Sequence, residues 1–553
     1  MLKPSDLLKK KNPYQPYILL FSGILFFLPF LGAVHLFDWD EINFAESARE
    51  MLISGNYTVV QINYQPFWEK PPLFFWLQVV SMKMWGVSEF AARFPNAIFG
   101  IITLLTLYYL GKRLHDARMG MIWALVYFGS FLPHLYFKSG IIDPVFNFFI
   151  FLSVVYLYRS ASRYPGKSAL RHAILAGLFS GLAVLTKGPV GFLLLLLTFL
   201  SYWVWSGFRK VSNLKNILAF ALTFTLVTTV WFGWETIKNG PWFLVEFIQY
   251  QIRLFTTPDA GHKQPFFYHF VVVLLGCFPL SIFALPSFRN EFISERGSFR
   301  KWMLCLFWVV MILFSIAETK IVHYSSMAYL PLSYLAARYL YHLISSKNLI
   351  NSGVSYVVLV IGLLFGLLLT ALPLVVLYKD ALIPLIKDPF AVGNLSVPVV
   401  WTGFESLIGF FFIVSVIVAY IFLRRQRTST ALLLLSYASA FTLLLYLIIV
   451  VPKIEAHSQR SAIEFYKTLQ NKEVYVRTIG FKSYAQYYYS QIQPGMPQEH
   501  LDEQWLLNGP IDRPVYFVSK VHRKKKLEAY PEIKLLKEEG GFAFFKREVP
   551  EQP

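Results

Sequence analysis

The sequence predicts a polytopic α-helical membrane protein with a small C-terminal α/β domain. The 553-residue chain is 56% hydrophobic and 15% charged, whereas a soluble globular protein has roughly 25% charged residues. Several windows are apolar over about 20 residues, which is the length of a helix that crosses a bilayer. From residue 452 onward the chain is more polar and shows strand and helix patterns. We therefore place a membrane domain in residues 1–451 and a soluble domain in residues 452–553.

About thirteen segments are apolar and long enough to be predicted as transmembrane helices. The first is not expected to be a cleaved signal, because it is long enough to span and no small-residue cleavage site follows it. The fifth and sixth are separated only by the short turn Lys187–Gly188–Pro189. The predicted spans are residues 17–36, 91–111, 119–137, 143–158, 172–186, 188–206, 216–236, 266–287, 302–317, 325–344, 353–378, 399–423 and 429–450.

Basic residues distinguish the two sides of the predicted membrane domain. Alternate connections, such as residues 112–118, 159–171 and 424–427, carry about twice as many Lys and Arg as the opposite connections, and cytoplasmic connections are the enriched ones. We therefore expect a cytoplasmic N-terminus and an extracytoplasmic C-terminus. The same rule accounts for the net charge of +19, so we expect no nucleic-acid partner.

Two extracytoplasmic connections are long. Residues 38–90 are too polar to span, and residues 41–52 within them are predicted to form an amphipathic helix along the membrane surface. Its apolar face carries Phe44, Ala48 and Met51, and off this face lie Glu46, Arg49 and Glu50. The second connection, residues 237–265, contains two prolines and a glycine and is expected to be a loop.

The patterns in the soluble domain predict three strands and two helices. The strands are expected where Val, Tyr and Phe are frequent. The expected strands are residues 473–478, 514–518 and 541–546, and the expected helices are residues 461–470 and 483–490.

Ionisable residues gather at the extracytoplasmic ends of the predicted spans. Such residues are costly at membrane depth and are usually functional. Polar residues also belong in ordinary loops, but that explanation fits less well for Asp143 and Lys187, which lie in tight turns among apolar residues. We therefore predict one shared site. Its candidates are Asp40, Glu41, Glu69, Lys70, Asp143, Lys187, Arg253, His262, Glu318, Lys320 and His323.

The residue types in this set suit the handling of a phosphate group. Lysine and arginine neutralise phosphate oxygens, and neighbouring carboxylates can act as a general base or orient a sugar hydroxyl. A water-soluble nucleotide sugar is found on the cytoplasmic side, so basic residues on the outer face suit a lipid-borne phosphate donor. The sequence has no phosphate-binding glycine loop, no dinucleotide fingerprint and no zinc-ligand spacing, which weakens ATP-driven transport and metalloprotease functions.

The sequence requires no cofactor. Whether a divalent metal ion binds beside the carboxylates stays open. The two cysteines, Cys277 and Cys305, both fall in predicted spans. They provide no disulfide framework and no metal-ligand spacing. We expect both to be small buried hydrophobic side chains.

Several motifs resemble those of the aminoarabinose transferases, which are bacterial members of the type C glycosyltransferase superfamily related to protein O-mannosyltransferases. The first two motifs are WDEINFAESAREM at residues 39–51 and EKPPL at residues 69–73. Others are Asp143–Pro144, Thr186–Lys187–Gly188–Pro189, Gln251–Ile252–Arg253 with His262, and Lys320 with Tyr324. The resemblance extends in colinear order over roughly residues 35–340.

The resemblance implies a type C glycosyltransferase fold, a polyprenyl-phosphate sugar donor and transfer with inversion at the anomeric carbon. It also implies residue roles, with Asp40 as the main catalytic carboxylate. The predicted catalytic residues are Asp40, Glu41 and Asp143. The predicted donor-phosphate ligands are Lys70, Arg253, Lys187 and Lys320. The predicted substrate-binding residues are Glu69, His262, Tyr324 and His323.

Two departures from the family pattern lie near the predicted site. Asn43–Phe44 replaces the usual Arg-Tyr, and Ala317–Glu318–Thr319 replaces a basic, glycine-containing run. They leave the sugar and the acceptor open. The expected acceptor is lipid A or lipopolysaccharide in the envelope of a bacterial inner membrane. Transfer to protein hydroxyls or to another glycolipid is the alternative. A transporter of lipid-linked sugars is a remote alternative. Transporters have internal repeats and ionisable residues at mid-membrane depth, and this sequence shows neither.

Overall fold

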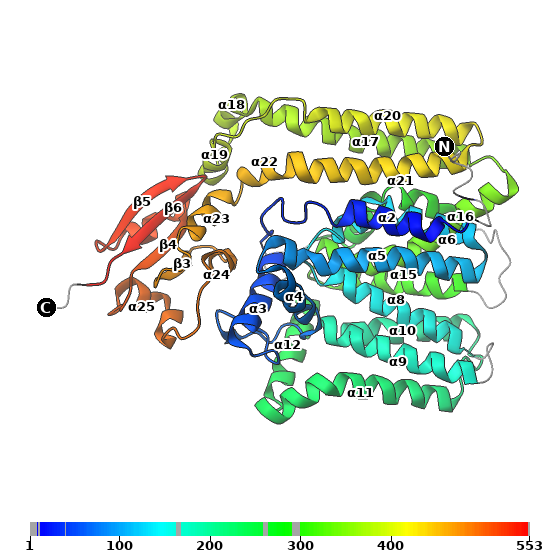
Figure 1. The fold of residues 1–553 in the computed structure, drawn as a ribbon, viewed down its shortest axis with the longest axis horizontal. Helices are drawn as coiled ribbons and strands as arrows, with labels where there is room; N and C mark the ends of the chain where they lie inside the picture. The colour runs from blue at the N-terminus through cyan, green and yellow to red at the C-terminus, as the bar shows by residue number, and fades with distance from the viewer. Residues whose placement is uncertain are drawn as a thin grey trace.

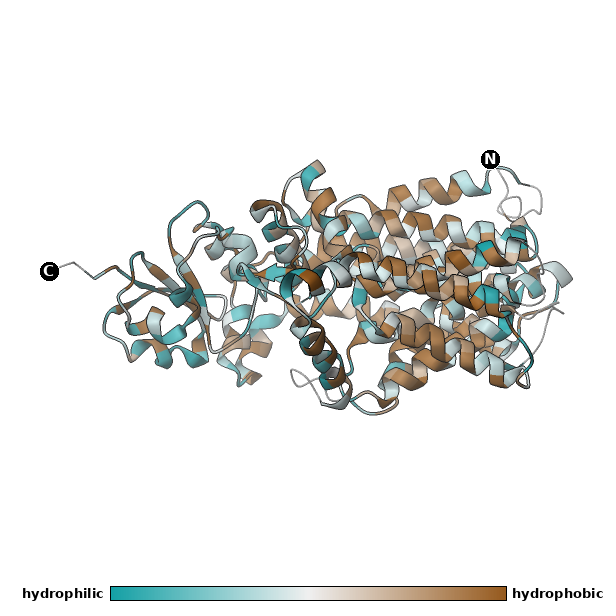
Figure 2. Cartoon of the chain, turned by 90° about the horizontal axis from the view of Figure 1, so that it is seen from below, coloured by the Kyte–Doolittle hydropathy of each residue, from teal (hydrophilic) through white to brown (hydrophobic). Residues whose placement is uncertain are grey.

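The structure is a computed structural model that describes Leu8 and residues 12–38, 40–161, 167–257, 264–289 and 299–550. A bundle of roughly parallel and antiparallel helices forms one part of the molecule, and a small sheet domain lies beyond one end of this bundle (Figure 1). Coloured by hydropathy, the bundle is mostly apolar and the sheet domain mostly polar (Figure 2). The structure therefore contains an apolar helical part and a polar C-terminal part with a sheet.

Most of the bundle consists of long helices that coincide with the predicted spans. Among the described residues, seven helices are long and apolar enough to cross a membrane, and one bent helix pair brings the number to eight. The bundle helices are α2 (Gln15–Phe27), α5 (Glu89–Leu114), α6 (Ala117–Phe128), α7 (Phe131–Tyr136), α8 (Asp143–Ser160), α9 (Lys167–Lys187), α10 (Val190–Trp205), α11 (Leu214–Asn239), α13 (Tyr268–Gly276), α14 (Leu280–Arg289), α15 (Phe299–Ile316), α16 (Tyr329–Ser346), α17 (Ser352–Leu377), α20 (Ser406–Arg424) and α21 (Thr428–Leu445).

The remaining predicted spans fall on helices that do not meet the length and apolarity of a span. Helices α2, α6 and α10 have 13, 12 and 16 residues. Helices α8 and α16 are longer but less apolar, and most of their residues are packed inside the bundle, where a helix need not be apolar toward lipid. The chain is a multi-pass membrane protein, and the number thirteen stays a prediction. Cys277 and Cys305 are both buried, as expected.

The sheet domain contains one strand more than the sequence predicts. Its strands are β3 (Tyr475–Ile479), β4 (Val515–Lys520), β5 (Ile533–Glu539) and β6 (Phe542–Arg547), in the order β3-β4-β6-β5. Strand β3 is parallel to β4, and the other pairs are antiparallel. The missed strand β5 is an edge strand whose residues after Ile533 are exposed, so it lacks the alternation of buried and exposed residues that identified the others.

The helices of the sheet domain are short. They are α23 (Arg460–Lys467), α24 (Ala485–Ser490), α25 (Glu503–Asn508) and α26 (Lys525–Glu528). Helix α22 (Val451–Ala456) continues the helix that begins at Thr428, so continuous helix extends to Ala456. The predicted boundary at residues 451/452 therefore falls within a helix rather than at its end. Between α17 and α20 are two further short helices, α18 (Lys379–Leu382) and α19 (Pro389–Leu395), and α19 lies beside the sheet domain (Figure 1).

The first long outer connection forms helix α3 (Asp40–Ser54), the hairpin β1 (Gln61–Ile62) and β2 (Gln65–Pro66), and helix α4 (Leu73–Trp85). The helix in α3 was predicted correctly, and its place along the membrane surface stays a prediction. Its polar face is not exposed to water, because Glu46, Arg49 and Glu50 are buried. Arg49 donates to Glu46 at 2.7 Å and to the carbonyl of Ile492 in the sheet domain at 2.9 Å.

Helix α3 is buried because protein covers its polar face instead of water. The Glu50 carboxylate accepts the backbone N–H groups of Asn63 and Tyr64 in the hairpin. Burial and the neighbouring Glu46 raise the pKa of Glu50 to about 9. Buried polar groups are stable when they are hydrogen-bonded, and the hairpin provides partners for Glu50 and the sheet domain one for Arg49.

The second outer connection is helical, contrary to the loop predicted for residues 237–265. Helix α12 (Trp242–Thr256) begins directly after Pro241, and proline is compatible with a helix start because the first turn leaves its N–H groups unbonded. The residues around the predicted loop signals, 258–263, lie outside the described residues. Helix α12 lies at the same end of the bundle as α3 and α4 (Figure 1).

The turn between α9 and α10 depends on a glycine. Gly188 has φ +96°, a conformation that side chains with a Cβ rarely adopt. A Cβ at this position would lie 2.5 Å from the Phe247 ring of α12. Gly188 therefore lets α12 pack directly over the turn that carries Lys187.

Replacing Gly188 with alanine is expected to destabilise the protein. The strained φ and the contact with Phe247 together predict a loss of about 1–3 kcal/mol in the free energy of unfolding, measured as a lower thermal unfolding temperature of the purified protein. Gly207→Ala is the matched control, because Gly207 also has a positive φ but has open space around its Cβ position. Equal effects of both substitutions would show that the Phe247 contact contributes nothing.

Candidate functional site

A cavity of about 950 Å³ lies at the end of the bundle where the outer connections and the sheet domain meet. Its walls come from α3, the segment before α4, α8, α9, α10, α12, α15, the 3₁₀ helix η2 (Val322–Ala328) and the sheet domain. The polar lining residues are Asp40, Asn43, Glu69, Lys70, Asp143, Asn147, Lys187, Tyr250, Gln251, Arg253, Thr319, His323, Tyr324, Lys482 and Tyr484. Of the eleven residues to which the sequence analysis assigned roles, eight line this cavity: Asp40, Glu69, Lys70, Asp143, Lys187, Arg253, His323 and Tyr324. Their roles stay predictions.

The two carboxylates at the centre of the cavity begin helices. Asp40 is the first residue of α3 and Asp143 the first of α8, where the positive end of the helix dipole stabilises a negative charge. The Lys187 ammonium, at the C-terminal end of α9, donates to Asp143 Oδ1 at 2.6 Å. His323 Nε2 lies 3.5 Å from Asp40 Oδ2 and 4.0 Å from Asp143 Oδ2. Four separate segments thus bring their titratable side chains close together.

Two further cations flank one aromatic ring on the side of α12. Lys70 Nζ lies 4.9 Å from the centre of the Tyr250 ring, and the Arg253 guanidinium carbon lies 5.1 Å from it. Burial lowers the pKa of Lys70, while the negative charges of Glu69 and Asp40 act in the opposite direction. Lysine and arginine side chains both bind phosphate oxygens, and arginine can do so through two parallel hydrogen bonds. This part of the cavity is therefore suited to bind a phosphate group.

The deeper wall of the cavity is apolar and continues onto the outer surface of the bundle. Leu193 and Leu196 of α10 and Ile248, Ile252 and Phe255 of α12 line the cavity and have exposed side chains. In a protein that spans a membrane, exposed apolar helix faces contact lipid chains. The cavity therefore combines a charged end with an apolar side that is continuous with the lipid-facing surface.

Glu41 does not line this cavity, although its neighbour Asp40 does. Its carboxylate accepts two hydrogen bonds from Arg93, at 2.8 and 2.7 Å, and one each from the N–H groups of Phe37 and Gly140. Burial alone raises the pKa of Glu41, but the Arg93 charge and these hydrogen bonds outweigh burial and lower it. A catalytic role for Glu41 does not fit this position. Its carboxylate is turned away from the cavity and is bonded to the Arg93 side chain and to two backbone N–H groups.

Lys320 and His262 are the other two predicted residues that are not among the cavity residues. Lys320 is buried, and its ammonium donates to the carbonyl of Ala317 at 2.6 Å. The predicted contact between Lys320 and the donor phosphate therefore does not fit its position, because the ammonium is directed to the end of α15. His262 lies outside the described residues. Glu318, in the original set of candidates, is also absent from the cavity lining.

The sheet domain contributes residues that the sequence analysis missed. Lys482 and Tyr484, which precede α24, line the cavity. Ser483 between them hydrogen-bonds to the Asp38 carboxylate, two residues before Asp40. A helix at 483–490 was predicted, but no sequence signal places it beside Asp40, because the two segments are more than 440 positions apart. Only the tertiary fold brings them together.

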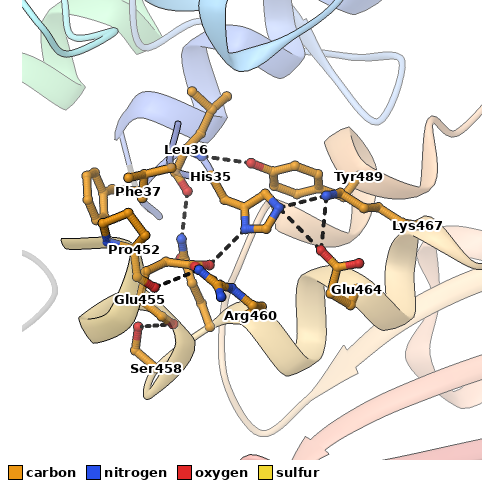
Figure 3. Close-up of polar contacts among 12 residues, drawn as sticks. His35, Leu36, Phe37, Pro452, Glu455, Ser458, Arg460, Glu464, Lys467 and Tyr489 are labelled. Atoms are coloured by element: carbon orange, nitrogen blue, oxygen red, sulfur yellow. Dashed lines mark hydrogen bonds and ion pairs between the residues drawn. The ribbon is translucent and has the colours of Figure 1, made fainter. Parts of the chain in front are cut away.

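The chain just before α3 is also held by the sheet domain and the helix that leads into it (Figure 3). The Leu36 N–H donates to the Tyr489 hydroxyl at 2.7 Å, and Gln459 donates to the Leu36 carbonyl at 2.9 Å. His35 Nδ1 lies 2.9 Å from Glu455, and His35 Nε2 lies 2.7 Å from the Lys467 ammonium. An ammonium can only donate, so Nε2 is the acceptor and Nδ1 carries the proton that bonds Glu455.

Among the described residues, no three His, Cys, Asp or Glu side chains lie close enough together to hold a metal ion. The Asp40, Asp143 and His323 cluster has its shortest cross-contacts at 3.5 and 4.0 Å. The absence of a required cofactor and the role of a divalent metal stay predictions.

The architecture and the site define a multi-pass membrane protein with the fold of a type C glycosyltransferase. The structure matches the crystal structure of ArnT from Cupriavidus metallidurans bound to undecaprenyl phosphate, with a TM-score of 0.74 and 17% identity. The match covers 97% of this chain and 98% of that chain. The apo structure of the same protein matches with a TM-score of 0.73. The predicted fold class is confirmed.

The amino-acid sequence is also similar to a family model and to particular proteins. Residues 69–234 match the family model for dolichyl-phosphate-mannose-protein mannosyltransferase. The undecaprenyl phosphate-alpha-4-amino-4-deoxy-L-arabinose arabinosyl transferases of Wigglesworthia glossinidia brevipalpis and Enterobacter sp. (strain 638) are 26% and 28% identical to the chain. These matches cover 57% and 61% of this chain, and 56% and 61% of the relatives, so the chain spans less than two thirds of their length. The resemblance predicted from the motifs is confirmed.

Glu41→Gln is expected to destabilise the protein, in contrast to a substitution at Asp40. It leaves the Arg93 guanidinium buried without a negative partner, and breaking a buried pair costs about 3–5 kcal/mol. The measurement is thermal unfolding of the purified protein. Asp40→Asn is the matched control, because the Asp40 side chain is 34% exposed and surface substitutions change stability by about 0.5 kcal/mol or less. Normal stability with lost activity in Glu41→Gln would restore a catalytic role for Glu41.

Proposed function

We propose that the protein is a glycosyltransferase that moves a sugar from a polyprenyl-phosphate donor to an acceptor in the bacterial envelope, lipid A or lipopolysaccharide. The observation that carries the proposal is the cavity that has cations at one end and an apolar, lipid-facing wall on its side. A lipid-borne phosphate fits both parts at once: its chain lies along α10 and α12, and its phosphate lies beside Lys70 and Arg253. The relatives named above use an undecaprenyl-phosphate sugar, and we extend that donor class to this chain.

In the proposed reaction the acceptor oxygen attacks the anomeric carbon, and the bond from that carbon to the phosphate oxygen breaks with inversion. Negative charge then develops on the leaving polyprenyl phosphate. Lys70 and Arg253 are already fixed around the position where this charge develops, and such preorganised groups are worth several kcal/mol in rate. Asp40 aligns the acceptor on the opposite side of the sugar. Asp143 holds Lys187 toward the cavity through its 2.6 Å ion pair.

The segregation of charge supports an extracytoplasmic site in the inner membrane. The cavity and the sheet domain lie at one end of the bundle, and the connections rich in Lys and Arg, such as the one between α5 and α6, lie at the other (Figure 1). Cytoplasmic connections are the basic ones. We therefore place the cavity and the sheet domain outside the cytoplasm.

Asp40→Asn is expected to abolish sugar transfer without unfolding the protein. The test is mass spectrometry of lipid A and envelope proteins from cells of the native host that carry wild-type protein or the variant. Loss of a sugar mass from lipid A in the variant supports the proposed acceptor. Loss of a sugar from proteins or another glycolipid instead moves the acceptor to the alternative class. No change in any fraction would contradict the catalytic role of Asp40.

Arg253→Gln and Lys70→Gln are each expected to weaken binding of undecaprenyl phosphate about 10- to 100-fold. A hydrogen bond to a charged group contributes about 1.5–3 kcal/mol, and each 1.4 kcal/mol is about tenfold in affinity. Binding to the purified protein in detergent measures the change. Arg209→Gln, an exposed arginine at the opposite end of the bundle, is the control and should bind as the wild type does. Unchanged binding in both cavity variants would contradict the proposed phosphate position.

A further inference from the structure

A second cavity, of about 1030 Å³, is lined by residues of α13, α14, α15, α16 and α17 and of the connection between the last two. It shares no lining residue with the cavity around Asp40. A bend of 116° separates α13 from α14, and both halves of this bent pair contribute to the lining. The proposed reaction gives the second cavity no role.

Most of the lining of the second cavity is apolar. Leu274 of α13, Leu285 of α14 and Trp308 of α15 line it and have exposed side chains. In a protein that spans a membrane, exposed apolar helix faces contact lipid chains. An acyl chain of the bilayer therefore has an apolar surface to pack against in this cavity.

One end of the second cavity is polar and positively charged. Arg289 is the last residue of α14, His342 lies near the end of α16, and Asn348 and Asn351 lie in the connection to α17. Helix α17 begins at the end of the bundle away from the sheet domain (Figure 1). Among the described residues that line the cavity, Arg289 is the only charged one and none is a carboxylate.

The backbone that carries Arg289 is fixed by the neighbouring helices. Arg300, near the start of α15, donates to the carbonyl of Ser287 at 2.8 Å. The Ser287 hydroxyl donates to the Leu335 carbonyl of α16, also at 2.8 Å. The end of α14 is therefore held by both α15 and α16, and the position of Arg289 at the rim of the cavity is part of the packing of the bundle.

The first turn of α17 adds to the positive charge of Arg289. Asn351 caps this helix by accepting the Gly353 N–H at 2.8 Å, and Gly353 and Val354 line the cavity. The first N–H groups of a helix have no acceptor within the helix, and the positive end of the helix dipole lies there. A negatively charged group at this end of the cavity is therefore favoured by Arg289 and by the dipole of α17.

We propose that the second cavity binds one anionic phospholipid from the leaflet at the end of the bundle opposite the sheet domain. The phosphate lies beside Arg289, and an acyl chain packs along α13, α14 and α15. Basic pockets between transmembrane helices on the cytoplasmic side bind anionic lipid headgroups, and the topology proposed above makes this leaflet the cytoplasmic one. The inference does not depend on the sugar-transfer reaction.

The lining favours an anionic headgroup over a zwitterionic one. Arginine pairs with a phosphate through charge-assisted hydrogen bonds, which both kinds of phospholipid allow. Phosphatidylethanolamine also carries an ammonium, which the described lining residues offer no carboxylate to pair with. Phosphatidylglycerol carries hydroxyls instead, and an asparagine amide such as that of Asn348 can bond to a hydroxyl. Phosphatidylglycerol is therefore the better match.

Helix α15 connects the second cavity with the cavity around Asp40. Phe307, Trp308 and Met311 line the second cavity, and Leu313 and Phe314 line the other one. A phospholipid in the second cavity therefore packs against a helix that also forms a wall of the candidate site.

Native mass spectrometry of the full-length, delipidated protein in detergent tests the inference. The protein is mixed with phosphatidylglycerol and phosphatidylethanolamine that carry identical acyl chains, and the wild type is expected to retain one phosphatidylglycerol in preference. Arg289→Gln is expected to bind phosphatidylglycerol about 5- to 10-fold more weakly, the usual contribution of one cation near an anionic headgroup. Arg289→Lys is expected to keep most of the affinity. Arg209→Gln, at an exposed position in the connection between α10 and α11, is the matched control.

Leu285→Trp tests the apolar part of the second cavity. The larger side chain occupies space that an acyl chain would fill, so both phospholipids are expected to bind more weakly whatever their headgroup. Leu285 is 47% exposed, so the substitution is not expected to unfold the protein, and thermal unfolding checks this. Wild-type binding of both lipids by a folded Leu285→Trp variant would overturn the inference.

Two further outcomes would also overturn it. One is equal retention of the two phospholipids by the wild type or unchanged binding in Arg289→Gln. The other is displacement of phosphatidylglycerol by added undecaprenyl phosphate together with weaker binding of undecaprenyl phosphate in Arg289→Gln, which would make a polyprenyl phosphate the occupant. A sugar-transfer assay reports on the proposed function separately, because neither Arg289 nor Leu285 lines the cavity around Asp40.

Discussion

The rest of the site depends on one buried ion pair, between Glu41 and Arg93. Its carboxylate also accepts the Gly140 N–H, which ties α3 to the turn that leads into α8. Its guanidinium also donates to the carbonyls of Leu31, Val34 and His35, which fixes the chain that enters α3. Asp40 and Asp143 begin the two helices that this pair joins. A buried pair is tolerated because its remaining hydrogen-bonding groups are satisfied, and the backbone atoms that satisfy them are the ones that position the two carboxylates.

The low dielectric of a membrane explains where the charged side chains of the cavity lie. Charged groups inside hydrocarbon are costly, and the charged side chains that line the cavity lie at one end of the bundle, where α3, α12 and the sheet domain cover them. The cavity that results joins two environments that a soluble enzyme rarely combines. Its polar end holds cations that suit a phosphate, and its side wall along α10 and α12 is continuous with the lipid-facing surface. A substrate with a charged head and a long apolar chain matches both.

Much of this organisation was predictable because it follows from hydrophobic pattern and charge. The apolar windows located the bundle helices, and the outer ends of those windows located Asp40, Lys70, Asp143 and Lys187. The sequence could not separate Asp40 from Glu41, since adjacent residues at a helix start point in different directions that only packing decides. It could not find Lys482, because a distant fold contact brings that residue to the cavity. Helix α12 was missed because prolines and a glycine near its ends outweighed its amphipathic pattern.

The contacts of His35, Leu36 and Asp38 with the sheet domain have a consequence for how the protein is made. The ribosome synthesises the segment before Asp40 near the start of the chain and its partners Glu455, Lys467, Ser483 and Tyr489 near the end. All the helices between them must be inserted before these partners meet. The cavity is therefore incomplete throughout membrane insertion, and it acquires its last wall only when the sheet domain folds. A chain stalled during translation would be embedded in the membrane without a finished site.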